Sequence, residues 1–370
     1  MFEFEGQKVT LSVTDDLAAL EAEWVALERE CAPSAYQRFA FVNGWAQNVA
    51  ASAGVSPRVL RGGVAGRTVL LAPLAVRHRP LPLLVPLSDS HTNLNGGLFA
   101  RGLRGGGLAE AALALMPEAE GFEACCMRRS GAERCGDRPV RSVHDAYVAN
   151  VGDGFAAFMA RNSGKRKRKK HRRSTRNFEL AGGWRVERVD LPASLEATLG
   201  EAWEWMAARF ARDGIVDPFA PPQVRRFFLD TCVACLADER PALGLWRLVV
   251  GSDTAAIMAA GFGGTSYAPM FTTYRMGGVE GDSPGEFLIY ELCEMVAAMG
   301  CREFDLGRGR EPYKVSWTDG AVPLYDIRIG RSARAKAYLG AREIAARAKR
   351  RVRDDQRLWA IAKRIRALRG

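Results

Sequence analysis

Residues 244–274, GLWRLVVGSDTAAIMAAGFGGTSYAPMFTTY, decide the fold class. Three runs rich in β-branched, aromatic and other apolar residues, 244–250, 254–262 and 266–274, are separated by short turns, the first being Gly251-Ser252-Asp253. Runs of this length bounded by glycine-containing turns predict strands. The segment therefore predicts a hairpin followed by a third strand.

The same order of elements is predicted twice along the chain. Helical periodicity precedes the hairpin at 203–212 and 222–238. In the first half, helical patterns at 15–30 and from Ala40 precede a strand, a glycine turn and a strand over 58–76. We expect two similarly folded halves of mixed α/β class.

The second half continues with features that the first half lacks. Gly281-Asp282-Ser283-Pro284-Gly285 precedes an amphipathic helix over 286–300. A buried strand at 302–306 follows, then the glycine-rich polar loop 307–317 and a last strand at 322–329, which we expect to close the carboxyl half.

Composition points to a globular protein. The 370 residues are 48% hydrophobic and 26% charged, close to the average of globular chains. An acidic amino terminus without an apolar segment behind it predicts the cytoplasm. Eight cysteines are too sparse for a disulfide framework, and Cys232-Val233-Ala234-Cys235 fits a helix core better than a metal or redox site. We expect no metal.

Positive charge is concentrated in two segments. Residues 161–176 hold ten basic and no acidic residues. Residues 331–370 hold 14 basic and three acidic residues, so the net charge of this segment equals the net charge of the whole chain, +11. The first segment is either a solvated helix between the halves or a contact for a phosphate, a polyanionic substrate or RNA. It lacks interleaved aromatic residues, which weakens a single-strand nucleic-acid reading.

The basic tail predicts an amphipathic helix over 333–368. Its apolar stripe comprises Leu358, Ile361, Ile365 and Leu368, bordered by Trp359. Such a helix fits an anionic membrane surface, but also a helix docked on its own domain or a frayed tail. The chain is therefore expected to be cytoplasmic, with a possible peripheral contact to the inner face of the membrane.

Two loops carry candidate chemistry. Ser283 is a good N-cap, Pro284 suits the first helical position, and Gly285 lets a ligand approach the backbone, so this helix start is a candidate anion site. The loop 307–317 clusters Tyr, Lys and Trp at a strand end.

Three further residues have two readings each. Asp305 and Arg308 flank that strand end, as a structural ion pair or as functional groups. His91, in the polar loop 88–97, is either a general base near neutral pH or a histidine that satisfies a turn.

These motifs together resemble the CelD-type, FemAB-like acyltransferases of the GNAT superfamily, over roughly residues 15–330. The resemblance rests on Ser283-Pro284-Gly285, on Phe304-Asp305-Leu306-x-Arg308-Gly309, on Tyr313-Lys314 and Trp317-Thr318, on the basic segment 166–176, on Arg209 with Gly214, and on the pattern Trp24, Leu27, Phe41 and Trp45. The usual GNAT glycine signature is absent, and Ser316 stands where relatives often carry arginine.

The resemblance implies a tandem GNAT-like fold with an acyl-donor cleft in the second half. It implies that Lys314 and Tyr313 act in catalysis, as a cationic stabiliser and as a proton donor or stacking group. The predicted donor-binding residues, for acetyl-CoA, are Ser283, Pro284, Gly285, Glu286 and Arg308. The predicted substrate contacts are His91, Asn93, Arg209 and Trp317.

The predicted organisation has four parts: an amino half (1–155), a basic linker helix (156–180), a catalytic half (181–330) and the basic tail (331–370). The predicted function is acetyl-CoA-dependent N- or O-acetyl transfer to a sugar-containing, envelope- or exopolysaccharide-related acceptor. Two alternatives stay open: aminoacyl-tRNA-dependent transfer, and a non-catalytic module that binds nucleic acid or anionic membrane through its basic segments.

Overall fold

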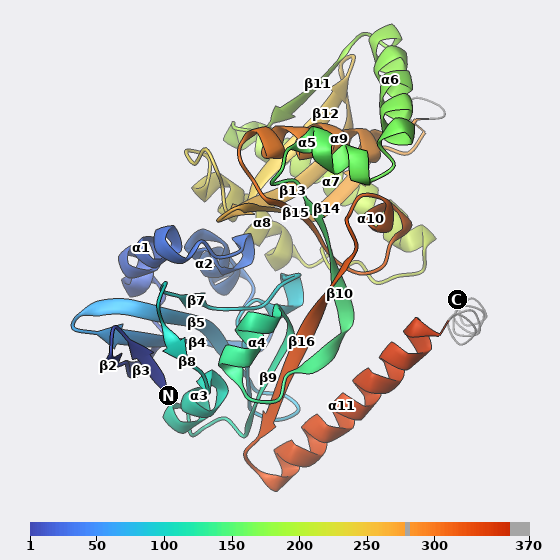
Figure 1. Ribbon diagram of the computed structural model, residues 1–370. Helices are drawn as coiled ribbons and strands as arrows, with labels where there is room; N and C mark the ends of the chain where they lie inside the picture. Colours follow the sequence, from blue (N-terminus) through green and yellow to red (C-terminus); the bar gives the residue numbers. More distant parts are fainter. Residues whose placement is uncertain (278–281, 356–370) are drawn as a thin grey trace. The chain divides into compact units, whose positions relative to one another are not determined.

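The computed structural model describes residues 1–277 and 282–355. The chain forms two compact units (Figure 1). Unit 1 comprises residues 1–31, 50–145 and 323–370, and unit 2 comprises residues 32–49 and 146–322. The predicted stripe from Leu358 to Leu368 and the turn residue Gly281 lie outside the described residues.

Unit 2 contains the hairpin that the sequence predicts. Its sheet has the order β11 (Trp184–Arg188), β12 (Gly244–Val250), β13 (Asp253–Gly263), β14 (Ser266–Tyr274), β15 (Glu303–Arg308) and the end of β10 (Val140–Asn150). Its helices are α2 (Phe39–Asn48), α5 (Phe155–Arg161), α6 (Gly164–Leu180), α7 (Pro192–Arg212), α8 (Pro222–Ala234), α9 (Pro284–Ala298) and α10 (Pro312–Ser316). A short 3-10 turn, Ala35–Gln37, precedes α2. Pairing is antiparallel except between β14 and β15.

Unit 1 repeats this arrangement. Its sheet has the order β3 (Thr10–Thr14), β4 (Val55–Val64), β5 (Arg67–Arg77), β6 (Leu83–Pro86), β9 (Gly121–Met127) and β16 (Ala321–Gly330), and only β6 and β9 pair in parallel along this path. β7 (Leu98–Phe99) pairs with β5. A separate three-stranded sheet has the order β2 (Gln7–Lys8), β1 (Phe2–Phe4) and β8 (Arg104–Gly105). The helices are α1 (Glu21–Cys31), α3 (Leu108–Leu115), α4 (Arg129–Cys135) and α11 (Ala333–Asp354), with 3-10 turns at Ala18–Leu20 and Asp89–His91.

Each unit takes its last strand from the other half of the chain. β10, which follows the elements of unit 1 in sequence, pairs through Val148 and Ala149 with β15 of unit 2. β16, which follows the elements of unit 2, pairs through Ile327 and Ile329 with β9 of unit 1. The predicted last strand therefore exists but does not close the carboxyl half. Sequence order alone cannot reveal this exchange, because both strands show the same apolar pattern.

The mixed α/β class and the repeated order of elements are confirmed. The domain boundaries stay a prediction; by contacts, residues 32–49, assigned to the amino half, group with unit 2 because α2 packs on α8. The predicted loop 307–317 contains a short helix, α10, with Pro312 in its first turn. Cys232 and Cys235 are buried free thiols on α8 and at its end, as a core reading expects.

The core of unit 2 fixes α9 against its sheet. The apolar face of α9, including Phe287, Leu288 and Leu292, is buried against β12, β13 and β14. Burying such side chains contributes about 1.5–3 kcal/mol each. No helix within residues 1–277 and 282–355 is long and apolar enough to cross a membrane.

Candidate functional site

The parallel strands β14 and β15 pair only at their beginnings. The register joins Ser266 with Glu303 and Tyr267 with Phe304, although β14 continues to Tyr274 and β15 to Arg308. Beyond Tyr267, the edge of β14 that faces β15 has no ladder partner in this register. A gap between two strands of one sheet exposes backbone donors and acceptors that a ligand can use.

A β-bulge lies on β14 at this gap. Along the β13–β14 pair, Ala260 lies opposite Pro269 and Ala259 opposite Phe271, so the register skips Met270. A bulge twists the strand and re-aims the backbone of the extra residue, and bulges are frequent next to active sites. The backbone of Met270 is therefore a candidate ligand contact.

A cavity of about 670 Å³ opens in unit 2 beside the bulge. This volume lies in the range typical of small-molecule sites, about 300–1,000 Å³. The elements that line it are the end of α7, the segment between α7 and α8, β14, the start of α9 and α10. The lining residues are Arg209, Phe210, Asp213, Ile215, Phe219, Met270, Phe271, Thr272, Tyr274, Asp282, Ser283, Gly285, Glu286, Ile289, Glu311, Tyr313 and Lys314.

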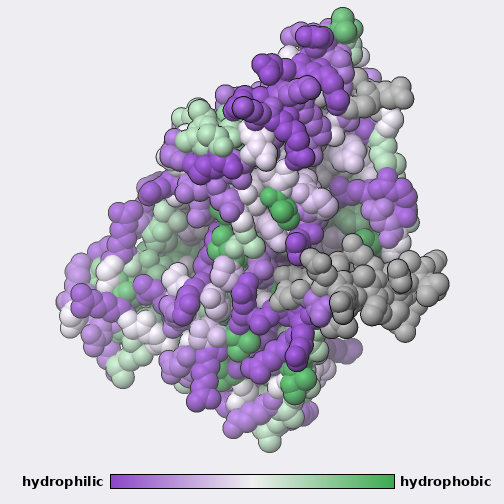
Figure 2. All heavy atoms as spheres, turned by 45° about the vertical axis from the view of Figure 1, so that its right-hand side comes forward, coloured by the Kyte–Doolittle hydropathy of each residue, from purple (hydrophilic) through white to green (hydrophobic). Residues whose placement is uncertain are grey.

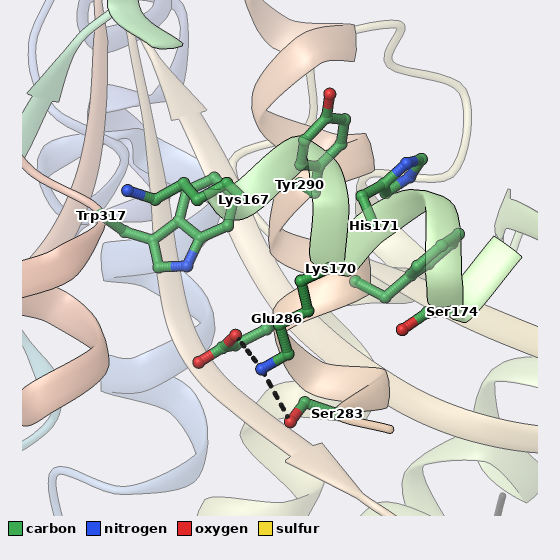
Figure 3. A pocket seen from close by; sticks show the side chains of 9 residues that line it. Lys167, Lys170, His171, Ser174, Ser283, Glu286, Tyr290 and Trp317 are labelled. Atoms are coloured by element: carbon green, nitrogen blue, oxygen red, sulfur yellow. Dashed lines mark hydrogen bonds and ion pairs between the residues drawn. The ribbon is translucent and has the colours of Figure 1, made fainter. Parts of the chain in front are cut away.

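A lysine from the basic helix lies at the start of α9. Lys170 Nζ donates to Ser283 Oγ at 3.1 Å and to Glu286 Oε2 at 2.5 Å (Figure 3). Ser283 and Glu286 also line the cavity. The first turn of a helix presents backbone N–H groups and a partial positive charge. Lys170 adds a positive charge that the Glu286 carboxylate balances, so an anion bound at this helix start would compete with Glu286 for the ammonium group.

The basic helix also holds the turn that precedes α9. The Asp282 side chain is fully buried, and it accepts hydrogen bonds from Ser174 Oγ at 2.6 Å and Asn177 Nδ2 at 2.8 Å. Arg173 Nη2 lies 3.7 Å from the same carboxylate. The side of α6 that faces α9, its inner face, therefore holds the start of α9 in place. The basic segment thus has a structural role and is not only a solvated linker.

Lys314 lies in the wall of the cavity on α10 and is nearly buried, with 7% of its surface exposed. Its Nζ donates to the Arg308 carbonyl oxygen at 2.9 Å and lies 3.7 Å from Glu311 Oε1. Burial lowers the pKa of Lys314, against the opposing effects of Glu311 and Asp305. Burial thus destabilises the Lys314 cation, and an anionic or partly negative ligand atom close to it would stabilise the charge.

Tyr313 is the neighbouring side chain in the same wall. Burial and the Glu311 carboxylate raise its pKa, so the phenol keeps its proton at neutral pH and can donate a hydrogen bond. Its ring lies 5.9 Å from Lys314 Nζ. The structure thus brings Tyr313 and Lys314 together with Arg209, Ser283, Gly285 and Glu286 around one cavity.

Three predicted site residues take other places. Trp317 is 4% exposed and stacks on Phe158 in the core of unit 2, with Lys167 Nζ 5.2 Å from its ring. Trp317 lines a small pocket between α6 and α9, and not the cavity beside the bulge (Figure 3). Pro284 is buried in the first turn of α9, and Arg308 takes part through its carbonyl oxygen, the acceptor for Lys314.

Gly285 also makes room for the neighbouring strand. A Cβ at this position would lie 3.2 Å from Tyr274 Cδ1 and 3.9 Å from Thr272 Cγ2. The small residue therefore accommodates β14 as well as leaving the helix start open. A larger side chain here would first displace the Tyr274 ring.

The corresponding gap in unit 1 is closed. Strands β6 and β9 pair in parallel at Leu83 and Leu84, and the chain then returns so that Asn95 bridges to Met127. The Asn95 backbone N–H donates to the Cys126 carbonyl at 3.1 Å, its Nδ2 donates to the Cys125 carbonyl at 2.8 Å, and its side chain is 4% exposed. The register of β5 and β6 runs without a shift. Unit 1 thus fills with its own chain the position that is open in unit 2.

His91 and Asn93 belong to this segment of unit 1. Ser90 Oγ lies 2.8 Å from His91 Nδ1, a contact within the turn. Neither residue lines the cavity of unit 2. Their role as substrate contacts stays a prediction. Within the described ranges, no group of three or more His, Cys, Asp or Glu side chains is arranged to hold a metal ion.

The outer face of α6 is strongly basic. Seven of its cationic side chains are exposed: Lys165, Arg166, Arg168, Lys169, Arg172, Arg173 and Arg176. Figure 2 shows hydrophilic side chains gathered at the top of the view, where α6 lies. This surface suits a polyanion or bulk solvent, whereas the inner face serves α9.

Sequence reasoning missed several residues of the site. In the sequence, Lys170 is one member of a basic run, and its helical spacing with Ser174 and Asn177 is the available signal of its role. The bulge at Met270 and the aromatic wall at Phe219 and Phe271 had no signal, because both depend on how strands pair and helices pack.

Comparison with known proteins agrees with this arrangement. Residues 165–315 match the family described as acetyltransferase (GNAT) domain. No curated protein matches the chain by sequence. Among solved structures, FemX is similar over 90% of this chain and 99% of its own, with a TM-score of 0.57 and 12% identity.

Two further solved structures share the fold. The C-terminal domain of a protein described as a lysylphosphatidylglycerol synthetase, from Agrobacterium fabrum, matches over 88% of this chain and 96% of its own, with a TM-score of 0.55 and 11% identity. L-PGS from Bacillus licheniformis matches over 85% and 92%, with a TM-score of 0.52 and 13% identity. At such identities the likeness concerns the fold. The chain is therefore an acyltransferase in which residues 165–315 match a GNAT domain, and its fold is similar to that of FemX.

Proposed function

We propose that unit 2 transfers an acyl group from an acyl-coenzyme A thioester to an amine or hydroxyl group. Acetyl-CoA is the donor predicted from the sequence, and a sugar-containing, envelope-related acceptor is the predicted acceptor. One observation carries the proposal: a single cavity joins the bulged edge of β14 to the helix start at Ser283 and Glu286. Such a cavity can hold a ligand that has a carbonyl group at one point and phosphates at another.

The reaction requires little covalent chemistry from the protein. The acceptor nitrogen or oxygen attacks the thioester carbonyl, the new amide or ester bond forms, and the carbon–sulfur bond breaks. The proton lost by the acceptor ends on the coenzyme A thiolate. The protein must align the reactants and stabilise the oxyanion.

Residues of the cavity fit these tasks. In this proposal the backbone N–H of Met270, at the bulge, donates to the thioester oxygen, and the Lys314 cation stabilises negative charge that develops nearby. The protonated Tyr313 phenol supplies a hydrogen bond or a proton to the leaving sulfur. Lys170 and the first turn of α9 bind the pyrophosphate.

The proposal predicts a selective effect of Lys170. Replacing Lys170 by alanine removes the cation that contacts Ser283 and Glu286. We expect acetyl-CoA to bind about 10- to 100-fold more weakly, because a hydrogen bond to a charged group contributes about 1.5–3 kcal/mol. Isothermal titration calorimetry on the full chain measures this change.

Lys169→Ala is the matched control. Lys169 is the exposed neighbour of Lys170 on the same helix, and its replacement by alanine removes the same charge. An equal loss in both variants would mean that only the general positive charge of α6 matters. Absence of acetyl-CoA binding in the wild type would refute the proposed donor.

The exposed cations of α6 favour one second candidate, an aminoacyl-tRNA donor. Binding through seven exposed cations would weaken steeply with salt, because each phosphate contact releases counterions. Titration of unfractionated tRNA at several salt concentrations tests this candidate. Tight, salt-sensitive tRNA binding in a protein that ignores acetyl-CoA would replace the first proposal.

The sequence resemblance is the basis for two further proposals: that the chain is a CelD-type protein, and that its acceptor is a saccharide. We also propose, from the sequence pattern, that the basic tail 331–370 contacts an anionic membrane. α11 begins this tail, and within it Arg342 is engaged with Glu123 of unit 1.

A further inference from the structure

One end of the cavity is apolar. Phe210 at the end of α7, Ile215 and Phe219 in the segment before α8, and Met270 and Phe271 on β14 line it. We refer to these five residues as the apolar end. Ser283 and Glu286, at the start of α9, line the same cavity.

The wall of the apolar end is held in place by packing within unit 2. The Phe219 ring stacks on Trp203 at 5.9 Å and meets Phe271 edge-on at 5.6 Å. The Phe219 carbonyl accepts a hydrogen bond from Arg225 Nε at 3.1 Å. Trp203 and Phe271 are each only 7% exposed, whereas Phe219 remains partly exposed. The free part of the ring is thus a preformed apolar surface.

Exposed apolar side chains extend this surface at the cavity. Ile215 is 55% exposed and Tyr274 is 44% exposed, and both line the cavity. Exposed apolar side chains that gather in a cavity indicate a site for an apolar ligand.

Two basic side chains of the cavity wall donate to backbone carbonyl groups. Arg209 Nη1 donates to the Thr272 carbonyl at 3.3 Å, and Lys314 Nζ donates to the Arg308 carbonyl at 2.9 Å. Asp213 and Glu311 also line the cavity, and each pairs with a neighbouring cation, Arg212 at 3.0 Å and Lys314 at 3.7 Å.

Met270 joins the apolar end to the reaction. It is the bulged residue proposed to hold the thioester oxygen, and it also lines the apolar end. An acyl carbon at the bulge would therefore direct its chain toward Phe271 and Phe219. The single methyl group of an acetyl group is too short to cover these rings, whereas a longer chain would cover them.

We propose that the apolar end binds the hydrocarbon chain of the transferred acyl group, so that the donor is a medium-chain acyl-coenzyme A. This inference rests on the proposed function and names its donor class. The new bond is then the amide or ester of a medium-chain acid, with coenzyme A released as the thiol.

The test is a chain-length series titrated into the full chain by calorimetry: coenzyme A, acetyl-CoA, butanoyl-CoA, hexanoyl-CoA and octanoyl-CoA. Full burial of each methylene would tighten binding about fourfold, the equivalent of about 0.8 kcal/mol. The cavity is open to solvent, so we expect at least a tenfold lower Kd for hexanoyl-CoA than for acetyl-CoA.

Two variants locate the chain. Phe219→Ala is expected to remove most of the gain from acetyl-CoA to hexanoyl-CoA. Ile215→Ser, at an exposed position that tolerates the change, is expected to reduce it at least threefold and keeps the test decisive if Phe219→Ala does not fold. Val216→Ser is the control, since Val216 is 90% exposed and does not line the cavity.

The outcomes are distinct. Equal affinity for acetyl-CoA and hexanoyl-CoA would overturn the inference and leave the proposed function intact. A gain that survives in both Phe219→Ala and Ile215→Ser would place the chain elsewhere and would also overturn it. If neither coenzyme A nor any thioester binds, the proposed function itself fails.

Discussion

Replacing Lys314 by methionine is expected to lower the transfer rate about 100- to 1,000-fold, the usual cost of losing one preorganised group that stabilises an oxyanion. Methionine keeps much of the side-chain volume and removes the charge. Lys314 is almost buried, and its Nζ contacts one carbonyl oxygen and lies 3.7 Å from Glu311. Initial rates of coenzyme A release with a saturating acceptor measure the effect.

The fold provides the control for this variant. Lys314→Met removes the desolvation cost of a buried ammonium but leaves the Arg308 carbonyl oxygen without its donor, so we expect little net change in the melting temperature. A variant that keeps the wild-type rate would show that Lys314 has only a structural role. A variant that melts at a lower temperature and loses activity in proportion would show the same.

The pH dependence of the rate follows from the same burial. Because burial lowers the pKa of Lys314, the cation loses its proton at a lower pH than an exposed lysine does. A rate that needs the cation falls as the pH rises through this lowered pKa. We expect an alkaline limb in the wild-type rate profile that is absent from the residual rate of Lys314→Met.

The largest expected effect on stability is at Glu123 in unit 1. Glu123 on β9 is 3% exposed and accepts from Arg342 Nε of α11 at 2.8 Å, Arg328 Nε of β16 at 3.0 Å and Arg77 Nη2 of β5 at 3.1 Å. Glu123→Ala leaves three guanidinium groups without their shared carboxylate. We expect a loss of about 3–5 kcal/mol in the free energy of unfolding of unit 1.

The acid dependence identifies the cause of this loss. Burial alone would raise the pKa of Glu123, but the surrounding arginines outweigh burial and lower it. A lowered carboxyl pKa stabilises the folded state above the ordinary pKa, and this contribution is lost as the pH falls through the lowered value. The difference between wild type and Glu123→Ala should therefore shrink in acid.

Chemical denaturation at several pH values measures this difference, with Glu118→Ala as the control. Glu118 pairs with Arg58 at 3.5 Å but is 45% exposed, so its loss should cost less than about 1 kcal/mol. An equal effect of both substitutions would contradict the account of unit 1.

The sequence predicts the elements of the fold well and their pairing poorly. The glycine turns at 251–253 and 263–264 identify β12, β13 and β14 because local chemistry determines them. The exchange of β10 and β16 depends on partners far apart in the sequence. No local pattern distinguishes those partners.

The candidate site divides in the same way. Tyr313, Lys314, Ser283 and Glu286 could be predicted because each lies at the start of a helix or in a polar loop after a strand. The bulge at Met270 could not be predicted, since a bulge is defined by the register of two strands.

Unit 1 shows the limit of motif reading. The loop 88–97 resembles a functional loop in composition, yet its Asn95 forms hydrogen bonds that close the gap between β6 and β9. A polar side chain that satisfies buried backbone groups has the same sequence signature as one that binds a ligand.

The central claim is that acyl-coenzyme A binds the open gap of unit 2 and not the closed gap of unit 1. Hydrogen–deuterium exchange of the full chain, with and without saturating acyl-coenzyme A, tests it most directly. We predict slower exchange in peptides that cover 268–274 and 284–290, and unchanged exchange in peptides that cover 83–95. Protection of 83–95, or no protection of 268–274 in a saturated complex, would contradict the account.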